Sequence, residues 1–79
     1  MISNETIKNR IRKGMAEKEM VITHIKFQGV SRINDRMTIK NITLSLDSLD
    51  GIGIDFFKMH LDEILLENGV DYSGILLEI

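Results

Sequence analysis

The apolar residues of the chain follow helical spacing first and strand spacing afterwards. Ile7, Ile11 and Met15 recur at a spacing of four, which places them on one face of a helix. Ser3 comes just before this run and suits the N-cap position, where a hydroxyl accepts a backbone hydrogen bond. The pattern therefore predicts an amphipathic helix over approximately 4–18.

From Met20 onward the apolar period becomes two, which is the period of half-buried strands. Between two such segments stand Asn34 and Asp35, which tolerate the positive φ of a tight two-residue turn. The sequence predicts one long antiparallel hairpin, roughly 20–33 and 36–46. This turn matches apolar positions across the two strands, in the pairs Phe27–Ile42, Ile25–Leu44, Thr23–Leu46 and Val30–Ile39.

The apolar pattern changes phase near Gly29. Before it the apolar side chains occupy odd positions of the first strand, whereas Val30 falls on the opposite face. The second strand changes in step, so we expect the outer hairpin to turn its apolar face away from the core, with Gly29 as a bend. An exposed patch there would be an interface formed by Val30, Met37 and Ile39. The basic residues along this arm are Lys26, Arg32, Arg36 and Lys40.

The second half of the chain predicts a helix and a further strand. Apolar residues at helical spacing, from Ile54 to Leu65, indicate a second amphipathic helix over about 53–68. Gly69 suits the position just after a helix. Residues 71–74 have the composition of a turn, and 75–79 form a short apolar run that predicts a third strand. The prediction is a single α+β domain over 1–79, of order α-β-β-α-β, with a long antiparallel hairpin packed by two helices.

Chain length and charge bear on partners. A chain of 79 residues buries only about 60% of its unfolded surface, so self-association is a natural source of further burial. Residues 1–40 carry nine bases and four acids, a net +5, whereas 41–79 carry one base and eight acids, a net −7. Such sorting indicates either a partner of matching sign or two halves that face each other in the fold or in a dimer.

Composition also narrows the location and the chemistry. The absence of cysteine excludes disulfides and thiolate metal sites, and it fits a reducing compartment. The polar N-terminus lacks the apolar run of a signal peptide, so we expect a cytoplasmic protein without membrane spans. His24 and His60 have no further ligands at standard metal spacing, and no catalytic constellation is recognisable. We therefore expect no enzyme, no cofactor and no metal.

One short motif has a known counterpart. Asp47-Ser48-Leu49-Asp50, followed by an apolar and acidic segment, resembles the Asp-Ser-Leu site of acyl and peptidyl carrier proteins. The resemblance implies that Ser48 carries phosphopantetheine at the start of a helix, in a family whose fold is all-helical. The alternative is a serine near a helix start, flanked by acids.

Three functions stay open on this evidence. The first is a non-enzymatic module of the regulator or inhibitor type that binds another protein. Such a module would form a homo-oligomer through the outer hairpin. The second is a nucleic-acid-binding protein that uses the basic first helix and the arm, because a basic ribbon with apolar residues can enter a groove. The third is a carrier protein with Ser48 as its modified residue.

Overall fold

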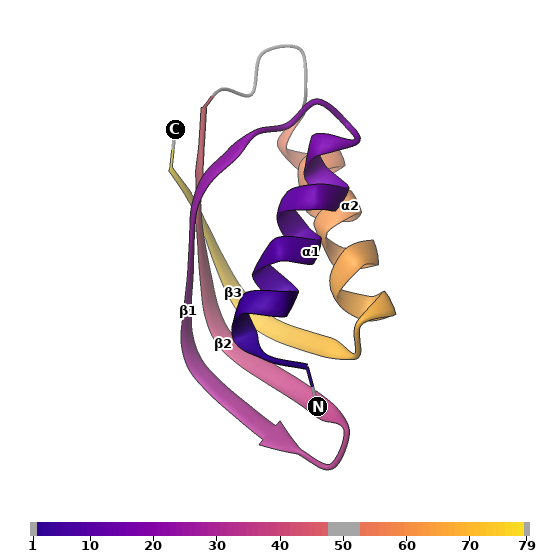
Figure 1. The fold of residues 1–79 in the computed structure, drawn as a ribbon. Helices are drawn as coiled ribbons and strands as arrows, with labels where there is room; N and C mark the ends of the chain where they lie inside the picture. The colour runs from indigo at the N-terminus through magenta and orange to yellow at the C-terminus, as the bar shows by residue number, and fades with distance from the viewer. Residues whose placement is uncertain (1, 48–52, 79) are drawn as a thin grey trace.

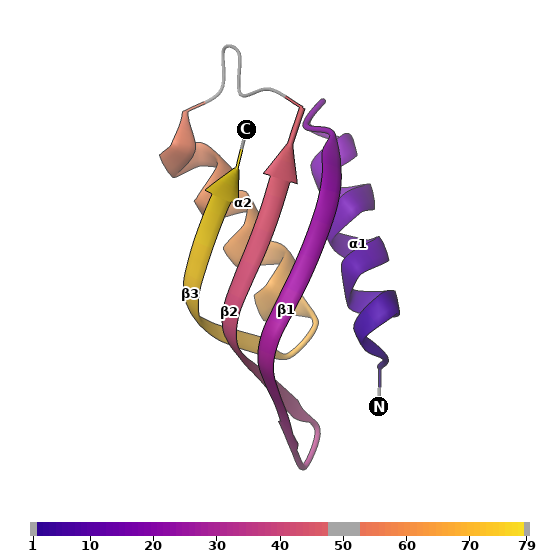
Figure 2. The ribbon, with the colours of Figure 1, turned by 90° about the vertical axis from the view of Figure 1, so that its left-hand side faces the viewer.

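A computed structural model describes residues 2–47 and 53–78 of the chain. Both helices cover the same face of a three-stranded sheet, and the described part of the chain places no helix on the other face (Figures 1 and 2). This confirms the expected α+β fold and the order α-β-β-α-β. The elements are α1 (Asn4–Ala16), β1 (Ile22–Ile33), β2 (Arg36–Leu46), α2 (Ile54–Glu67) and β3 (Val70–Glu78).

The sheet has the order β1-β2-β3, so β2 is central. The predicted hairpin is confirmed: β1 and β2 are antiparallel, Ile33 pairs with Arg36, and Asn34 has the positive φ of 57° that the turn requires. β3 runs parallel to β2. Parallel neighbours need a crossover connection, and α2 lies in that connection, which brings it onto the sheet beside α1.

The start of the hairpin differs from the expected register. Ile22, and not Thr23, pairs with Leu46, because the pairing shifts between Ile22 and His24. This bulge turns Ile22 toward the core that also holds Ile25, although strict alternation would place the two on opposite faces. The burial of Ile22 compensates for the interrupted pairing.

The expectation that the outer hairpin faces away from the core is wrong for β2. Met37 and Ile39 are buried in the same core as Ile42 and Leu44, although the apolar pattern changes phase between the two pairs. The phase change lies at the level of Gly29, whose φ is +68°. Gly29 therefore bends the sheet so that both apolar sets face the helices.

β3 also differs from prediction, because it begins at Val70 and includes residues 71–74 that were expected to form a turn. Gly69, with a φ of +70°, follows α2 as predicted. Val70 and Tyr72 then pair with Met37 and Ile39 on β2. A composition typical of turns is overridden here by pairing with a central strand.

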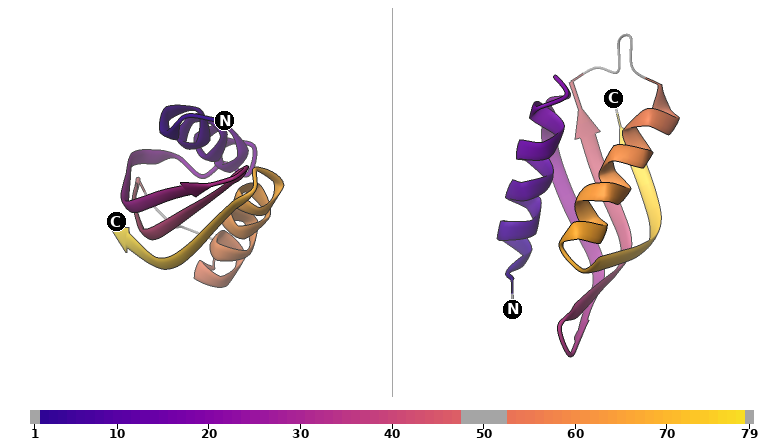
Figure 3. Two further views of the ribbon diagram at one scale, coloured as in Figure 1. Left: turned by 90° about the horizontal axis from the view of Figure 1, so that it is seen from below. Right: turned by 90° about the vertical axis from the view of Figure 1, so that its right-hand side faces the viewer.

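The core lies between the sheet and the helices, which approach each other closely at Gly14. A side chain at Gly14 would place its Cβ 2.5 Å from Cδ1 of Ile64 on α2. Figure 3 shows α1 and α2 side by side over the sheet. The ten largest fully buried side chains come from both helices, from the segment between α1 and β1, and from β2: Phe57, Ile7, Ile11, Met15, Met20, Ile39, Ile42, Leu44, Leu61 and Leu65.

Candidate protein-binding surface

Helix α2 carries apolar side chains on two faces. Its inner face is the one predicted from the sequence, and it is buried against the sheet and α1 through Phe57, Leu61, Ile64 and Leu65. The second apolar set points away from that face. This set consists of Phe56, Met59 and Leu66, which together with Glu63 form a stripe at spacings of three and four residues. We call these four residues the outer stripe.

The apolar members of the outer stripe are substantially exposed. Their exposed fractions are 43% for Phe56, 54% for Met59 and 72% for Leu66. Ile54, at the start of α2, is also exposed. Single exposed apolar residues are normal on a protein surface, but a row along one helix is the kind of surface that marks a contact site.

Acidic residues surround the outer stripe. Helix α2 carries four acids, Asp55, Asp62, Glu63 and Glu67, and one base, Lys58, which gives a net −3. Asp71, at the start of β3, lies near the Leu66 end and binds Arg36 at 2.7 Å. The surface is therefore apolar at Phe56, Met59 and Leu66, is interrupted by the acid Glu63, and has further acids beside it.

Two hollows lie beside the outer stripe, one toward each end. The first has a volume of about 200 Å³ and is lined by Lys18, Phe56, Met59, His60 and Glu63. The second has a volume of about 240 Å³ and is lined by Asp62, Leu65, Leu66, Val70, Asp71 and Tyr72. The first hollow combines apolar side chains with the acid Glu63 and the base Lys18, whereas the second combines them with two acids, Asp62 and Asp71. The second hollow therefore suits an apolar side chain of a partner with a base next to it.

His60 connects the two helices. Its Nε2 lies 3.0 Å from the carbonyl oxygen of Gly14, and its Nδ1 lies 3.7 Å from Glu63. Its ring stacks on Phe56 with 6.5 Å between centroids. Among residues 2–47 and 53–78, no three His, Asp or Glu side chains come together to hold a metal ion. In this structure His60 fixes the position of α2 and of Phe56.

The residues that were expected to form an interface on the outer hairpin are not exposed on the surface of the chain. Met37 and Ile39 are buried inside the molecule, and Val30 is partly buried against the same core. Met37 and Ile39 instead pack within the hydrophobic core. The physical reason is the bend at Gly29, which keeps the outer part of β2 on the helical face of the sheet.

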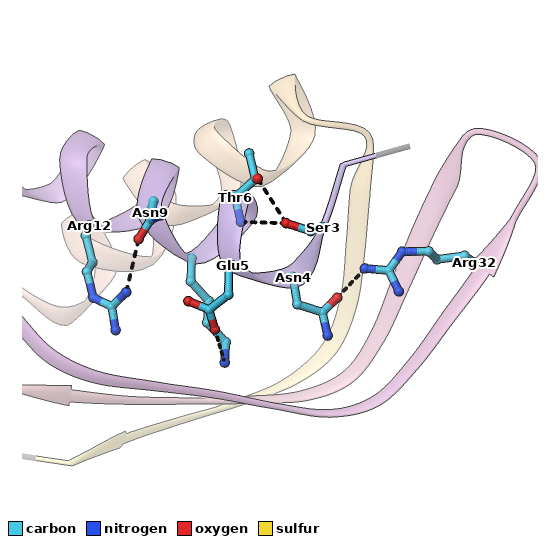
Figure 4. Close-up of polar contacts among 8 residues, drawn as sticks. Ser3, Asn4, Glu5, Thr6, Asn9, Arg12 and Arg32 are labelled. Atoms are coloured by element: carbon cyan, nitrogen blue, oxygen red, sulfur yellow. Dashed lines mark hydrogen bonds and ion pairs between the residues drawn. The ribbon is translucent and has the colours of Figure 1, made fainter.

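The four basic residues of the arm do not share one face. Arg32 donates a hydrogen bond to Asn4 of α1, on the helical side (Figure 4). Arg36 is paired with Asp71, and Lys40 packs beside Gly29 at the bend. Lys26 alternates with Ile25 and Phe27 and so lies on the sheet face that no helix covers.

The bases of α1 are also engaged in local contacts. Figure 4 shows Arg12 donating to Asn9 within the helix, beside the capping bonds between Ser3 and Thr6. Lys8 lies 3.7 Å from Glu5 and over the ring of Phe27. Arg10 instead donates a hydrogen bond to Asn68, just after α2, and it lines a hollow together with Lys13 and the α2 acids Glu63 and Glu67.

Comparison with protein-family models, curated proteins and solved structures found no match. Neither helix in the described part of the chain is long and apolar enough to cross a membrane. Ser48, Leu49 and Asp50 lie outside the described residues, so modification of Ser48 stays a prediction. The three-stranded sheet contradicts the all-helical fold that the resemblance to carrier proteins implies.

The outer stripe was missed in the sequence because only the apolar set that faces the core was considered. The signal was nevertheless there. Phe56, Met59 and Leu66 stand at i, i+3 and i+10, a second helical series in the same segment. This second series predicts a second apolar face on the same helix, in addition to the face that packs against the core.

Proposed function

We propose that this chain is a non-enzymatic interaction module that acts by binding protein through the outer face of α2. The observation that carries the proposal is the exposure of Phe56, Met59 and Leu66 along one helix whose opposite face already fills the core. Exposed apolar rows of this kind are found where a second protein removes them from water.

The size of the apolar contribution can be bounded. Complete burial of one such side chain contributes about 1.5–3 kcal/mol relative to full exposure. Because the three side chains are already about half buried on average, a partner would gain roughly 1 kcal/mol from each, or about 3 kcal/mol in total. Association costs about 4–15 kcal/mol, so the stripe needs polar or charged contacts around it.

Self-association remains part of the proposal. A chain this small gains from any further burial, and the expectation of a homo-oligomer came from that argument. Met37 and Ile39 are buried, so a homo-oligomer would have to form through other residues.

A photo-crosslinking experiment tests the proposal. A benzophenone amino acid replaces Met59 in cells that express the chain naturally, and the same amino acid replaces Val21 in a control. The two positions have matched exposed fractions, 54% and 57%, but Val21 lies outside the α2 surface. We expect crosslinked protein from position 59 and none, or far less, from position 21.

A second comparison uses Leu66 and Ile33, both 72% exposed. Leu66→Asp should diminish the crosslink from position 59, whereas Ile33→Asp at the tip of the hairpin should leave it unchanged. Circular dichroism of each purified variant confirms that the fold is intact. Equal crosslinking from positions 59 and 21, or an unchanged yield in Leu66→Asp, would show that the outer stripe is not a binding surface.

A further inference from the structure

We propose that the occupant of the outer stripe is a basic amphipathic helix of a partner protein. This inference rests on the proposed function and specifies the chemistry of its partner. It follows from the charges at the borders of the stripe, from the arrangement of the two hollows and from the ion pairs within the chain.

In the described part of the chain, few ion pairs join its basic half to its acidic half. The sequence allowed the basic first half and the acidic second half to neutralise each other internally. Among the described residues, however, a single pair of Lys or Arg with Asp or Glu joins the two halves, Arg36 with Asp71. The remaining ion pairs, Lys8 with Glu5 and His60 with Glu63, are each local to one helix.

The acids of α2 differ in their surroundings: Glu63 and Glu67 line a hollow that also contains Arg10 and Lys13 of α1, whereas Asp55 and Asp62 do not. Within the described residues Asp55, Asp62 and Glu67 form no ion pair, and Asp62 accepts a hydrogen bond from the Tyr72 hydroxyl. These acids stand on both sides of the apolar row. A partner helix with apolar residues flanked by Lys or Arg would match both features at once.

The spacing of Met59 and Leu66 along α2 suits a helical partner. One hollow contains Met59 and the other contains Leu66, seven residues farther along α2. Seven residues of helix span about 10.5 Å. Apolar residues at i and i+7 of a partner helix are separated by the same distance, so two such anchors would contact Met59 and Leu66.

A second copy of α2 does not fit this surface. Two copies packed through their outer stripes would each bring a helix of net −3 to the interface, with Lys58 as the single base on each. The like charges would oppose the stabilisation gained by burying the apolar side chains. The basic helix of another copy does not serve either, because the apolar residues of α1, Ile7, Ile11 and Met15, are buried in its own core.

Designed peptides test this inference directly. Three helical peptides share one row of leucines at i, i+3, i+4 and i+7 and differ only in the flanking residues, which are lysine, glutamine or glutamate. Fluorescence anisotropy measures their binding to the full chain at low and high salt. We expect the lysine peptide to bind about tenfold more tightly than the glutamine peptide, the glutamate peptide not to bind, and the preference to shrink with salt.

Variants locate the binding site. Met59→Ser with Leu66→Ser should weaken binding of the lysine peptide about tenfold or more. The control pair Val21→Ser with Ile33→Ser removes matched exposed side chains and should leave binding unchanged. Glu63→Gln with Glu67→Gln should reduce the preference for lysine over glutamine, whereas Glu17→Gln with Glu19→Gln should not.

The outcomes separate this inference from the proposed function. Crosslinking from position 59 together with equal affinity for the lysine and glutamine peptides would overturn the basic helix and leave the protein-binding surface. A crosslinked product of twice the chain mass as the sole product would identify a second copy and also overturn it. Amide NMR shifts caused by the lysine peptide at α1 or β1 instead of α2 would do the same.

Discussion

The bend at Gly29 can be tested by adding a single methyl group. Gly29→Ala forces an L side chain into a φ of +68°, which costs about 1–2 kcal/mol. The new Cβ would also lie 2.7 Å from the Cβ of Lys40 on the neighbouring strand, where no flexible side-chain end can move aside. Overpacking of this kind costs about 1–3 kcal/mol, so we expect a total loss of about 2–5 kcal/mol in the free energy of unfolding.

Gly69→Ala is the matched control for this change. Gly69 has nearly the same φ, +70°, but the nearest atom to an added Cβ is 3.7 Å away. It should therefore lose only the conformational contribution of about 1–2 kcal/mol. Urea unfolding followed by circular dichroism gives the loss of unfolding free energy for both variants. Combining Lys40→Gly with Gly29→Ala removes the Cβ that the new methyl group would contact, so the steric part of the loss should be regained. Equal losses at Gly29 and Gly69, with no recovery in the double variant, would refute the close approach of the strands at the bend.

Three further predictions follow from burial and charge. Ile39→Asp should unfold the protein, as measured by circular dichroism, because it places an unpaired charge at a position with no exposed surface. The control Ile33→Asp should remain folded. A folded Ile39→Asp variant that changes only its oligomeric state would support the hairpin interface instead. Burial, with a smaller contribution from the hydrogen bond to Asp62 and its charge, raises the pKa of Tyr72 to about 12. The folded state thus favours the protonated phenol, so stability present below pH about 10 is lost as the pH rises toward about 12, and Tyr72→Phe should lack this part of the loss. Absorbance at alkaline pH reads the group directly, because Tyr72 is the sole tyrosine. Incubation with a phosphopantetheinyl transferase and coenzyme A should leave the mass unchanged, and a gain abolished by Ser48→Ala would instead establish a carrier protein.

The sequence predicted what depends on local periodicity. The spacing of Ile7, Ile11 and Met15, the turn at Asn34 and the glycine after α2 all appear in the structure, because each rests on backbone geometry within a few residues. Element order followed from the same patterns. These features need no knowledge of how distant segments pack.

The errors arose where distant segments decide the outcome. Residues 71–74 have the composition of a turn, but pairing with the central strand extends them. Thr23 was paired with Leu46, because a bulge shifts the strand without changing its alternation pattern in the sequence. The burial of Met37 depends on a bend whose direction a single sequence does not show. Met37 and Ile39, which were predicted to form an interface, therefore lie in the core of the chain.

The bend at Gly29 helps to determine which apolar side chains of the chain are exposed. By keeping Met37 and Ile39 on the helical side of the sheet, the bend removes the patch that the hairpin would otherwise expose. The large apolar side chains that remain exposed on a helix are then those of α2, with acids on both sides. A polar side chain at Met59 or Leu66 would leave the core unchanged, since the inner face of α2 supplies the packing. We therefore expect Met59→Ser with Leu66→Ser to leave the free energy of unfolding nearly unchanged while it weakens binding to the proposed partner helix.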